Sequence, residues 1–397
     1  MLFFSLAIKL SKCMLFIMKK SKNNSQYFAI VAVESSGDRI GAGVVKEIKK
    51  LNKQASFIGI GATNLQNCGV ELVADIASIS AIGVLDPFLK IKKWLSVYAS
   101  FRLECKKRAV KAVILVDGFD FNIRLARALY DEGVKVMWYV GPKIWAWRKN
   151  RLELFKTRVH LTALLFPFEK PLYDAAKIPA FAAGHPFADH LTDDYCRNVI
   201  FNRQNIKKNK IVALFPGSRE KEILRTGPIL LKAAQRLKDM GFTPVISIVK
   251  SSVQAKQLKS DAQVSGINIW ENDAESLLKQ SFMTIAASGT VTLEAAFYLI
   301  PMIIIYKIDS LSWLLAKKVL NISYAGLPNW IAEKQIVPEL LQDQLTLDNL
   351  IYEVQNLIKP ANYELQIIEL LKVAKSVHVK NAALKVAEAF LKLNEGG

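Results

Sequence analysis

Short apolar runs alternate with stretches of helical spacing along most of this sequence. Runs that are apolar on both faces and separated by helices are typical of a mainly parallel, doubly wound sheet. A first series lies at Tyr27–Val33, Ser56–Gly61, Ala112–Val116, Lys135–Val140 and Ala163–Phe168. A second series lies at Ile211–Phe215, Thr243–Val249, Ile267–Trp270, Phe282–Ala287 and Met302–Tyr306. The pattern predicts an α/β fold with two Rossmann-like, doubly wound domains.

Chain length and local polarity set the expected domain boundaries. The 397 residues exceed one typical core, and 193–210 turns polar and loses its periodicity, as a linker would. We therefore predict domains over 27–200 and 201–360, a ligand cleft between them, and a helical tail over 361–397. The apolar, lysine-interrupted segment 1–26 is either an amphipathic surface anchor or a dispensable extension. The tail is expected either to return to the first domain or to reach a partner subunit in a homodimer.

Composition restricts the class of partner. The chain has 54 Lys and Arg against 35 Asp and Glu, and the resulting net charge of +19 favours anionic membrane surfaces or phosphorylated substrates. Because no nucleic-acid-binding motif accompanies these charges, we expect no nucleic acid partner. The four cysteines lie far apart, and no His, Asp or Glu set has metal-ligand spacing. We therefore expect no metal site and a reducing cytoplasmic environment.

The apolar run Ile211–Phe215 passes through a Pro-Gly turn into a helical pattern. Such a turn points backbone N–H groups and the helix dipole at one spot. Gly217 permits the turn, Ser218 can cap the helix, and Arg219 offers a planar fork for phosphate oxygens. An ordinary turn with a surface arginine explains this stretch equally well when it is considered alone.

A second loop of the same kind favours the phosphate-binding interpretation. Ser288, Gly289 and Thr290 follow another apolar run and lead at once into a helix. Small residues at this point allow a phosphate to approach the helix N-terminus closely. Glu294, one turn later, can accept hydrogen bonds from ribose hydroxyls, although a solvated helix residue is the alternative. Two such loops in one domain predict a site for a nucleotide diphosphate.

The first domain carries acids at the end of a buried strand. Asp117, Asp120 and Asn122 directly follow Ala112–Val116, and the carboxyl ends of parallel strands are where such folds place reactive groups. We predict that Asp117 is a general base. Asp120 or Asn122 can instead start the next helix as a cap.

Two further groups of residues lie at strand ends. Two indoles and a guanidinium fall within 145–148, including Trp147 and Arg148, where core packing would explain one tryptophan. His185 stands between Gly184 and Pro186 at another strand end. These residues are candidates for a substrate-binding surface.

Residues 85–108 combine large apolar side chains with many lysines and arginines. A basic amphipathic helix of this kind docks on anionic lipid, and an ordinary helix that packs on a sheet shows a similar pattern. From the lipid interpretation we predict the membrane-facing residues Phe88, Lys92, Lys93, Trp94 and Phe101.

The motifs, taken in order, resemble lipid-A-disaccharide synthase, a cytoplasmic glycosyltransferase of lipopolysaccharide assembly. The resemblance extends from Tyr27 to about Gln342, and each motif alone is weak. Its motifs are Glu34–Asp38, Asp117–Asn122, Trp145–Arg148, Phe166–Lys170, Gly184–Pro186, Pro216–Arg219 with Glu222, Ala287–Thr290 with Glu294, Leu327–Asn329 and Val337–Gln342.

The resemblance implies a glycosyltransferase B-type fold and a reaction. UDP-2,3-diacylglucosamine and 2,3-diacylglucosamine 1-phosphate would form a β-1,6-linked disaccharide 1-phosphate and UDP, at the inner leaflet of the cytoplasmic membrane. Because the donor linkage is α and the product β, one in-line displacement suffices. No cofactor and no divalent metal are implied, since Arg219 and the helix termini can offset the diphosphate charge.

The resemblance also implies residue roles. Asp117 would be the base, Arg219 and the 288–290 loop would hold the diphosphate, and Glu294 would hold ribose. On the donor side, Asn329, Glu339 and Gln342 would complete the site. The acceptor side or cleft would include Glu34, Ser36, Gly37, Asp38, Asn122, Trp147, Arg148 and His185.

Departures from the family pattern gather in the first domain. Val33 replaces a glycine, 62–65 replaces a Gly-Pro-Arg-Met-like turn, Phe119 replaces a proline, and 141–143 replaces Ser-Pro-Ser. Because these positions flank the expected acceptor site, they bear on acyl length and acceptor choice. A different UDP-sugar-using B-type glycosyltransferase, an epimerase, or a non-catalytic nucleotide-sugar-binding membrane-surface protein are the alternatives.

Overall fold

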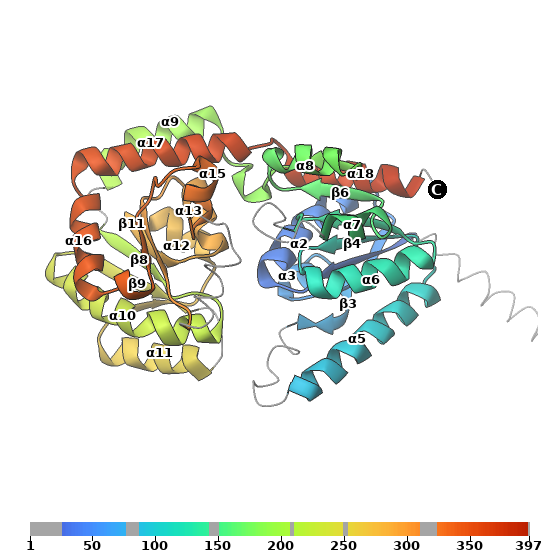
Figure 1. Ribbon diagram of the computed structural model, residues 1–397, viewed down its shortest axis with the longest axis horizontal. Helices are drawn as coiled ribbons and strands as arrows, with labels where there is room; N and C mark the ends of the chain where they lie inside the picture. The colour runs from blue at the N-terminus through green and yellow to red at the C-terminus, as the bar shows by residue number, and fades with distance from the viewer. Residues whose placement is uncertain are drawn as a thin grey trace, which may run out of the picture. The chain divides into compact units, whose positions relative to one another are not determined.

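A computed structural model describes residues 26–76, 87–142, 151–206, 210–248, 253–309 and 324–395, with side chains described except at 87–91 and 200–206. The chain forms two compact units (Figure 1). The first comprises Met1–Tyr139, Thr157–Leu161 and Ala383–Gly397, and the second Val140–Lys156 and Thr162–Ala382. The predicted extension over 1–26 falls, except for its last residue, outside the described residues.

The first sheet has seven strands in the order β3-β2-β1-β4-β5-β6-β7. β1 pairs in parallel with β2 and β4, β4 with β5, and β6 with β7. The strands are β1 Gln26–Ala32, β2 Ala55–Gly61, β3 Val70–Asp75, β4 Ala112–Val116, β5 Lys135–Tyr139, β6 Leu161–Leu164 and β7 Ala180–Ala182.

The second sheet has six parallel strands in the order β10-β9-β8-β11-β12-β13. They are β8 Ile211–Phe215, β9 Thr243–Ser247, β10 Asn268–Trp270, β11 Met283–Ala287, β12 Met302–Tyr306 and β13 Glu339–Leu341. Both sheets confirm the predicted α/β fold. The edge strands β3, β7 and β13 have no predicted counterpart, because β7 and β13 are only three residues long and β3 has a single buried residue, so that they carry little of the buried apolar pattern.

Helices connect the strands. They are α2 Ser35–Leu51, α3 Thr63–Asn67, α5 Pro87–Lys107, α6 Phe119–Asp131, α7 Arg151–Lys156, α8 Lys170–Ala175, α9 Asp193–Ile206, α10 Glu220–Asp239, α11 Val253–Val264, α12 Ala274–Gln280, α13 Thr290–Phe297, α15 Leu327–Ala332, α16 Leu347–Leu357, α17 Pro360–Val377 and α18 Ala382–Glu395. Short 3₁₀ turns lie at Pro167–Glu169, Pro186–Ala188 and Gln342–Gln344.

Successive residues of the central strands enter two cores on opposite faces of the second sheet. Val212 and Leu214 of β8 pack with α10, α11 and α16, whereas Ala213 and Phe215 pack with α12, α13 and α17. This alternation is the side-chain period of a strand. Figure 1 shows α10 and α11 on one side of this sheet and α9 and α17 on the other. Burial on both faces explains why these strands are apolar throughout.

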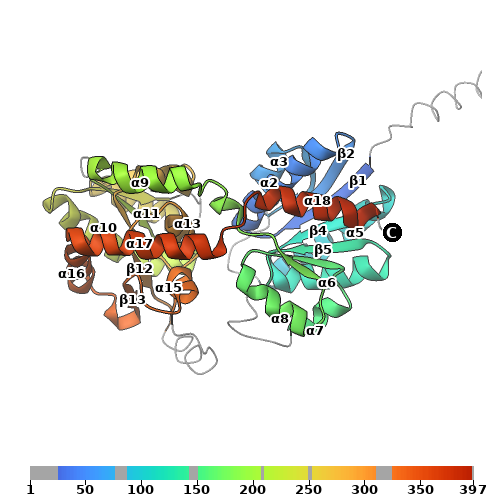
Figure 2. The ribbon, with the colours of Figure 1, turned by 90° about the horizontal axis from the view of Figure 1, so that it is seen from above.

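The predicted linker and the predicted C-terminal tail have clear outcomes. The supposed linker over 193–210 is helical over α9, where Tyr195 and Val199 pack against the core of the second sheet. The tail returns to the first unit, because the Phe390 ring of α18 meets the Phe28 ring of β1 at 5.1 Å between centroids. Figure 2 shows α18 lying over the strands of this unit. No helix within the described part of the chain has the length and apolar character needed to cross a bilayer.

Candidate active site

The order of the second sheet reverses between β8 and β11, which are neighbours in the sheet although β9 and β10 lie between them in sequence. Phe215 pairs in register with Ala286, so the loops that follow both strands leave the sheet side by side. Open α/β sheets bind ligands at such a switch point, beyond the carboxyl ends of the strands. The two loops predicted from the sequence therefore belong to one edge.

The first of these loops is closed by a side chain of its own helix. The N–H groups of Ser218 and Arg219 donate to Glu222 Oε2 at 2.9 and 3.1 Å, and Arg219 Nη1 donates to Glu222 Oε1 at 3.2 Å. We expected these N–H groups to face a phosphate and Ser218 to cap the helix. The structure corrects both points, because Glu222 accepts the N–H groups and Arg219 occupies the N-cap position of α10.

The second loop is open. Ser288 Oγ donates to the carbonyl of Ala325 at 2.7 Å, but no described residue accepts from the N–H groups of Gly289, Thr290 or Val291. Gly289 and Thr290 are exposed, and a Cβ on Gly289 would meet only the Ala287 carbonyl oxygen, at 3.9 Å. Free N–H groups at a helix N-terminus form an anion site. The start of α13 has this arrangement.

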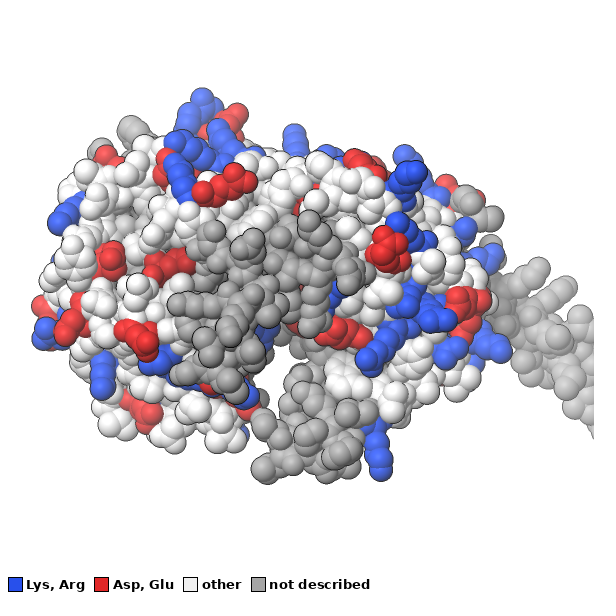
Figure 3. Space-filling model, in the orientation of Figure 1, with Lys and Arg blue, Asp and Glu red and all other residues white. Residues whose placement is uncertain are grey.

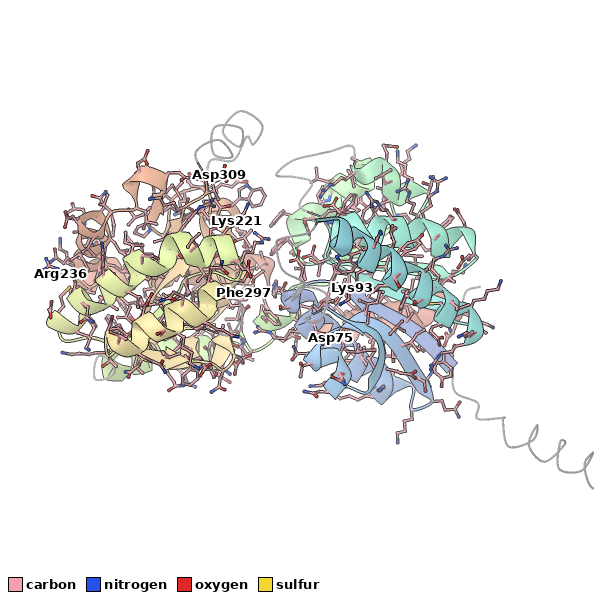
Figure 4. All side chains as sticks on the ribbon, turned by 90° about the horizontal axis from the view of Figure 1, so that it is seen from below. Asp75, Lys93, Lys221, Arg236, Phe297 and Asp309 are labelled. Carbon is pink, nitrogen blue, oxygen red and sulfur yellow. The ribbon has the colours of Figure 1, made fainter. Side chains whose placement is uncertain are left out.

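Residues that the sequence reading missed lie beside the first loop. The phenol of Tyr306, at the end of β12, is half-buried, and burial first, then Glu222, raises its pKa, while Arg219 and Arg225 oppose the shift. Arg225 Nη2 lies 3.6 Å from Asp309 Oδ2. Figure 4 shows Lys221, in the first turn of α10, and Asp309 at the same end of the unit, away from Arg236. A second arginine in the early turns of α10 was the sequence signal for this group.

A buried network fixes the open loop from behind. Asn329 Oδ1 accepts from the N–H groups of Ile336 and Val337 at 2.7 and 2.8 Å, and its Nδ2 donates to Val337 O and Glu339 Oε1, both at 2.8 Å. The carboxylate of Glu339 also accepts from Ala325 and Gly326 N–H at 2.7 and 2.9 Å. All four hydrogen-bonding positions of the Asn329 amide are thus used inside the chain. We expected Asn329 and Glu339 to contact the donor, whereas these contacts make them supports of the 288–290 loop.

Replacing Asn329 with alanine is expected to lower the free energy of unfolding by about 3 kcal/mol. The side chain is fully buried, and its loss leaves the N–H groups of Ile336 and Val337 without acceptors. Calorimetric melting measures the change, with Asn349→Ala as the control, because exposed Asn349 donates to a single carbonyl of a surface turn. Equal stability of the two variants would contradict the assigned role of Asn329.

The other donor-side candidates are also largely enclosed. Glu294 is 6 % exposed within α13. Gln342 adopts a left-handed backbone conformation with φ of 53° directly after β13. With its amide turned to satisfy both groups, Gln342 donates to Ile308 O at 3.0 Å and accepts from Ile308 N at 3.2 Å. It therefore joins the ends of β12 and β13.

In the first sheet, Asp117 lies directly beyond β4, at the switch point between β1 and β4. Asp117 and Gly118 are consecutive left-handed residues with φ of 50° and 54°. Buried Asn122 fixes this turn, since its Nδ2 donates to Asp117 O at 2.8 Å and to Val116 O at 3.2 Å. Left-handed non-glycine residues gather at functional sites. Asp117 is partly exposed there, whereas Asn122 is a support.

Val33 and Gly118 fit one another at this turn. A Cβ on Gly118 would overlap the Cγ2 atom of Val33, so the glycine is needed for its space as well as for its φ. The family departure at Val33 is thus packed directly against the turn that holds Asp117.

The loop after β1 contains both exposed and structural residues. Glu34 is exposed and Ser36 is partly exposed, whereas Gly37 and Asp38 are buried. The Asp38 carboxylate accepts from the N–H groups of Ala62, Asn64 and Leu65 and from Asn64 Nδ2. We expected Asp38 on the acceptor side, but these four bonds give it the role of capping α3.

His185 is a core residue. It is 4 % exposed, its Nδ1 accepts from Phe187 N–H at 3.3 Å, and its ring meets those of Phe166, Phe187 and Phe297. This aromatic packing replaces the substrate contact predicted from the sequence. Trp147 and Arg148 lie outside the described residues.

Three of the predicted membrane-facing residues of α5, Lys93, Trp94 and Phe101, lie on its inward side. Phe101 is fully buried, the Trp94 ring packs on the Phe121 ring of α6 at 4.7 Å, and partly buried Lys93 is engaged within the chain. The outward face instead carries Leu95 and Leu103, which are 62 % and 53 % exposed. Exposed Lys92, Lys106 and Lys107 accompany them. The side chain of Phe88 lies outside the described ones.

Among the described residues, no group of three or more His, Cys, Asp or Glu side chains is placed to hold a metal ion. The charge of an anionic ligand would be met at the second sheet by Arg219 and by the start of α13. The first sheet thus presents the partly exposed residue Asp117 beyond β4. The second sheet presents Arg219 and the N–H groups at the start of α13 beyond β8 and β11.

Solved structures of low identity share this fold. A UDP-GlcNAc 2-epimerase from Neisseria meningitidis bound to UDP-GlcNAc has a TM-score of 0.62 and 14% identity, over 92% of this chain and 99% of that one. A glycosyltransferase from Rickettsia africae has a TM-score of 0.51 and 15% identity, over 94% and 100%. These similarities establish the glycosyltransferase B-type fold.

Closer relatives are found by sequence. Lipid-A-disaccharide synthase of Geobacter sulfurreducens is 33% identical over 340 residues, covering 84% of this chain and 88% of that protein. The protein of the same name from Coxiella burnetii is 33% identical over 341 residues, covering 85% and 90%. A family model described as lipid-A-disaccharide synthetase matches residues 28–388. The chain belongs to the lipid-A-disaccharide synthase family.

Proposed function

We propose that this chain condenses UDP-2,3-diacylglucosamine with 2,3-diacylglucosamine 1-phosphate to give the β-1,6-linked disaccharide 1-phosphate and UDP. Family membership supports the reaction class. One observation carries the donor assignment: the open N-terminus of α13 and exposed Arg219 follow neighbouring strands, β11 and β8, of one sheet. An anionic leaving group needs this combination of N–H groups and positive charge.

The proposed displacement requires stabilisation of the departing UDP. As the bond between the donor C1 and the phosphate oxygen breaks, its electron pair leaves with UDP. The N–H groups of Gly289 and Thr290 and the helix dipole would bind the diphosphate. The guanidinium of Arg219, whose side chain is 74% exposed, would supply a bidentate positive charge. Glu294 would remain the ribose partner.

The proposed attack requires removal of the proton from the acceptor 6-hydroxyl. An oxygen lone pair of this hydroxyl forms the new bond to C1, and Asp117 takes the proton as general base. The left-handed turn at 117–118 and the Asn122 amide would hold the carboxylate in place. Attack opposite to the α-linked leaving group then gives the β product in one step.

We also propose that the protein associates peripherally with the inner leaflet of the cytoplasmic membrane, where its acylated substrates reside. Exposed Leu95 and Leu103 on α5 would enter the interface, and Lys92, Lys106 and Lys107 would meet lipid phosphates. Figure 3 shows basic side chains gathered over the part of the first unit that holds α5 and α6.

The double substitution Leu95→Ser/Leu103→Ser is expected to weaken binding to anionic vesicles at least about tenfold. Each buried leucine contributes roughly 1.5–3 kcal/mol when it leaves water. Co-sedimentation with phosphatidylglycerol-containing vesicles measures the change. Leu365→Ser is the matched control, because Leu365 is 58% exposed on α17 in the other unit. Equal loss in the control, or no loss in the double variant, would contradict the assignment of this face.

A donor comparison tests the proposed function. Purified protein should transfer sugar from UDP-2,3-diacylglucosamine and use UDP-N-acetylglucosamine poorly. Efficient transfer from the non-acylated donor would indicate another glycosyltransferase activity. Epimerisation of the donor without transfer would indicate an epimerase, and UDP binding without turnover a non-catalytic binding protein.

A further inference from the structure

Glu222 occupies the loop that the sequence suggests for phosphate binding. Its side chain is 13% exposed, whereas that of Arg219 is 74% exposed. One carboxylate oxygen accepts both loop N–H groups, and the other accepts from Arg219 Nη1. The two oxygens therefore have separate tasks, one toward the backbone and one toward the guanidinium.

The loop is built around this carboxylate. Gly217 has φ of 107°, and a Cβ there would lie 2.6 Å from Glu222 Oε2 and 2.7 Å from Glu222 Cβ. Buried Thr226, one turn further along α10, donates from Oγ1 to Pro216 O at 2.6 Å. The loop is thus held by two residues of its own helix, with room for Glu222 only because residue 217 lacks a side chain.

Helix capping alone does not explain a negative charge at this position. A glutamine three residues into a helix caps it by the same hydrogen bonds. A carboxylate beside the expected diphosphate adds repulsion, which a capping role alone would avoid. The contact that a glutamine cannot reproduce is the one to Arg219, because an amide nitrogen would face a donor there.

An arginine as exposed as Arg219 samples many rotamers, and ordering it costs free energy when a ligand binds. The contact from Nη1 to Glu222 limits this freedom in advance. It leaves Nε and Nη2 of the planar fork to donate to phosphate oxygens. Such preorganisation strengthens electrostatic stabilisation of a developing charge.

We propose that Glu222 is a positioning residue that holds the Arg219 guanidinium ready for the donor diphosphate, while the 289–291 N–H groups form the backbone part of the phosphate site. This inference rests on the proposed function for the role of Arg219. The loop that contains Arg219 would then bind the diphosphate through a side chain, and the loop at 289–291 would bind it through backbone N–H groups.

A double-mutant cycle with Glu222→Gln and Arg219→Ala tests the inference. Glu222→Gln is expected to lower kcat about tenfold and to weaken UDP binding about fivefold, with the melting temperature almost unchanged. In the Arg219→Ala background, Glu222→Gln should change neither quantity further. Gly217→Ala, which displaces Glu222, should resemble Glu222→Gln in kcat and UDP binding.

Thr346→Ala is the matched control for helix capping. Thr346 Oγ1 caps α16 by accepting from Asn349 N–H at 3.2 Å, so its loss should lower the melting temperature and leave kcat and UDP binding unchanged.

Four results would overturn the inference. If the two substitutions are additive, or if Glu222→Gln has wild-type kcat, Glu222 does not act through Arg219. If Glu222→Gln binds UDP more tightly, its carboxylate competes with phosphate. In each of these cases Arg219→Ala can still be impaired, and the proposed function stands. If Arg219→Ala itself has wild-type activity and UDP affinity, both the inference and the proposed donor site fail.

Discussion

Replacing Asp117 with asparagine is expected to lower kcat about 1,000-fold while the protein stays folded, as for loss of a general base. Asparagine adopts the left-handed conformation that Asp117 has, with φ of 50°, as readily as aspartate. The Asp117 N–H donates to Tyr139 O and the Asp117 carbonyl accepts from Asn122 Nδ2, and neither hydrogen bond involves the replaced atoms. Rates at saturating substrate, together with melting temperatures, measure the effect.

Asp120→Asn is the control for Asp117. Asp120 is exposed in the first turn of α6, where a negative charge interacts favourably with the helix dipole and stabilises the helix by about 0.3–1 kcal/mol. This variant should keep most of its activity. If Asp120→Asn is inactive and Asp117→Asn is active, the base has been assigned to the wrong carboxylate of the two.

Replacing Arg219 with alanine is expected to lower kcat/KM about 100- to 1,000-fold and to weaken UDP binding, by analogy with the loss of one oxyanion donor. Because the side chain is largely exposed, the fold should be unaffected. Arg219→Lys should recover only part of the activity, since lysine restores a point charge without the planar fork. Steady-state rates and calorimetric titration with UDP measure both effects.

Arg225→Ala provides the comparison for Arg219. Arg225 belongs to the same helix but has an acidic neighbour in Asp309, so its loss should affect UDP binding less than loss of Arg219. Similar UDP affinity in the wild type and in Arg219→Ala would contradict the donor site proposed at this edge.

The fold was predictable because its central strands are buried on both faces. The apolar runs at 211–215 and 283–287 need no tertiary information to be recognised, and their helices follow at once. The edge strand β13 was missed, since its three residues show no period. Helix α9 was mistaken for a linker because polar residues outnumber apolar ones over Asp193–Ile206, although Tyr195 and Val199 contact the core.

The candidate site was predictable as a set of positions but not as a set of contacts. A motif can place Asn329 near Ser288, but it cannot show that the Asn329 amide is saturated by Val337, Ile336 and Glu339. Nor can it show that Glu222 takes the loop N–H groups. These assignments depend on side-chain geometry that several different sequences could satisfy.

Helix α5 shows a different limit. Its apolar residues lie on more than one side, so spacing alone does not decide which side covers the sheet. The structure places Phe101 inward and Leu95 and Leu103 outward. The membrane interpretation survives as a proposal that keeps Lys92 from the predicted set and adds Leu95, Leu103, Lys106 and Lys107.

The turnover of purified protein with UDP-2,3-diacylglucosamine and radiolabelled 2,3-diacylglucosamine 1-phosphate, in the presence of EDTA, tests the central claim most directly. We expect labelled disaccharide 1-phosphate and UDP in equal amounts, with the β anomer as the only product and no loss of rate on chelation. Absence of labelled disaccharide from folded, UDP-binding protein would contradict the proposed reaction and would point to a different acceptor at the turn formed by Val33 and Gly118.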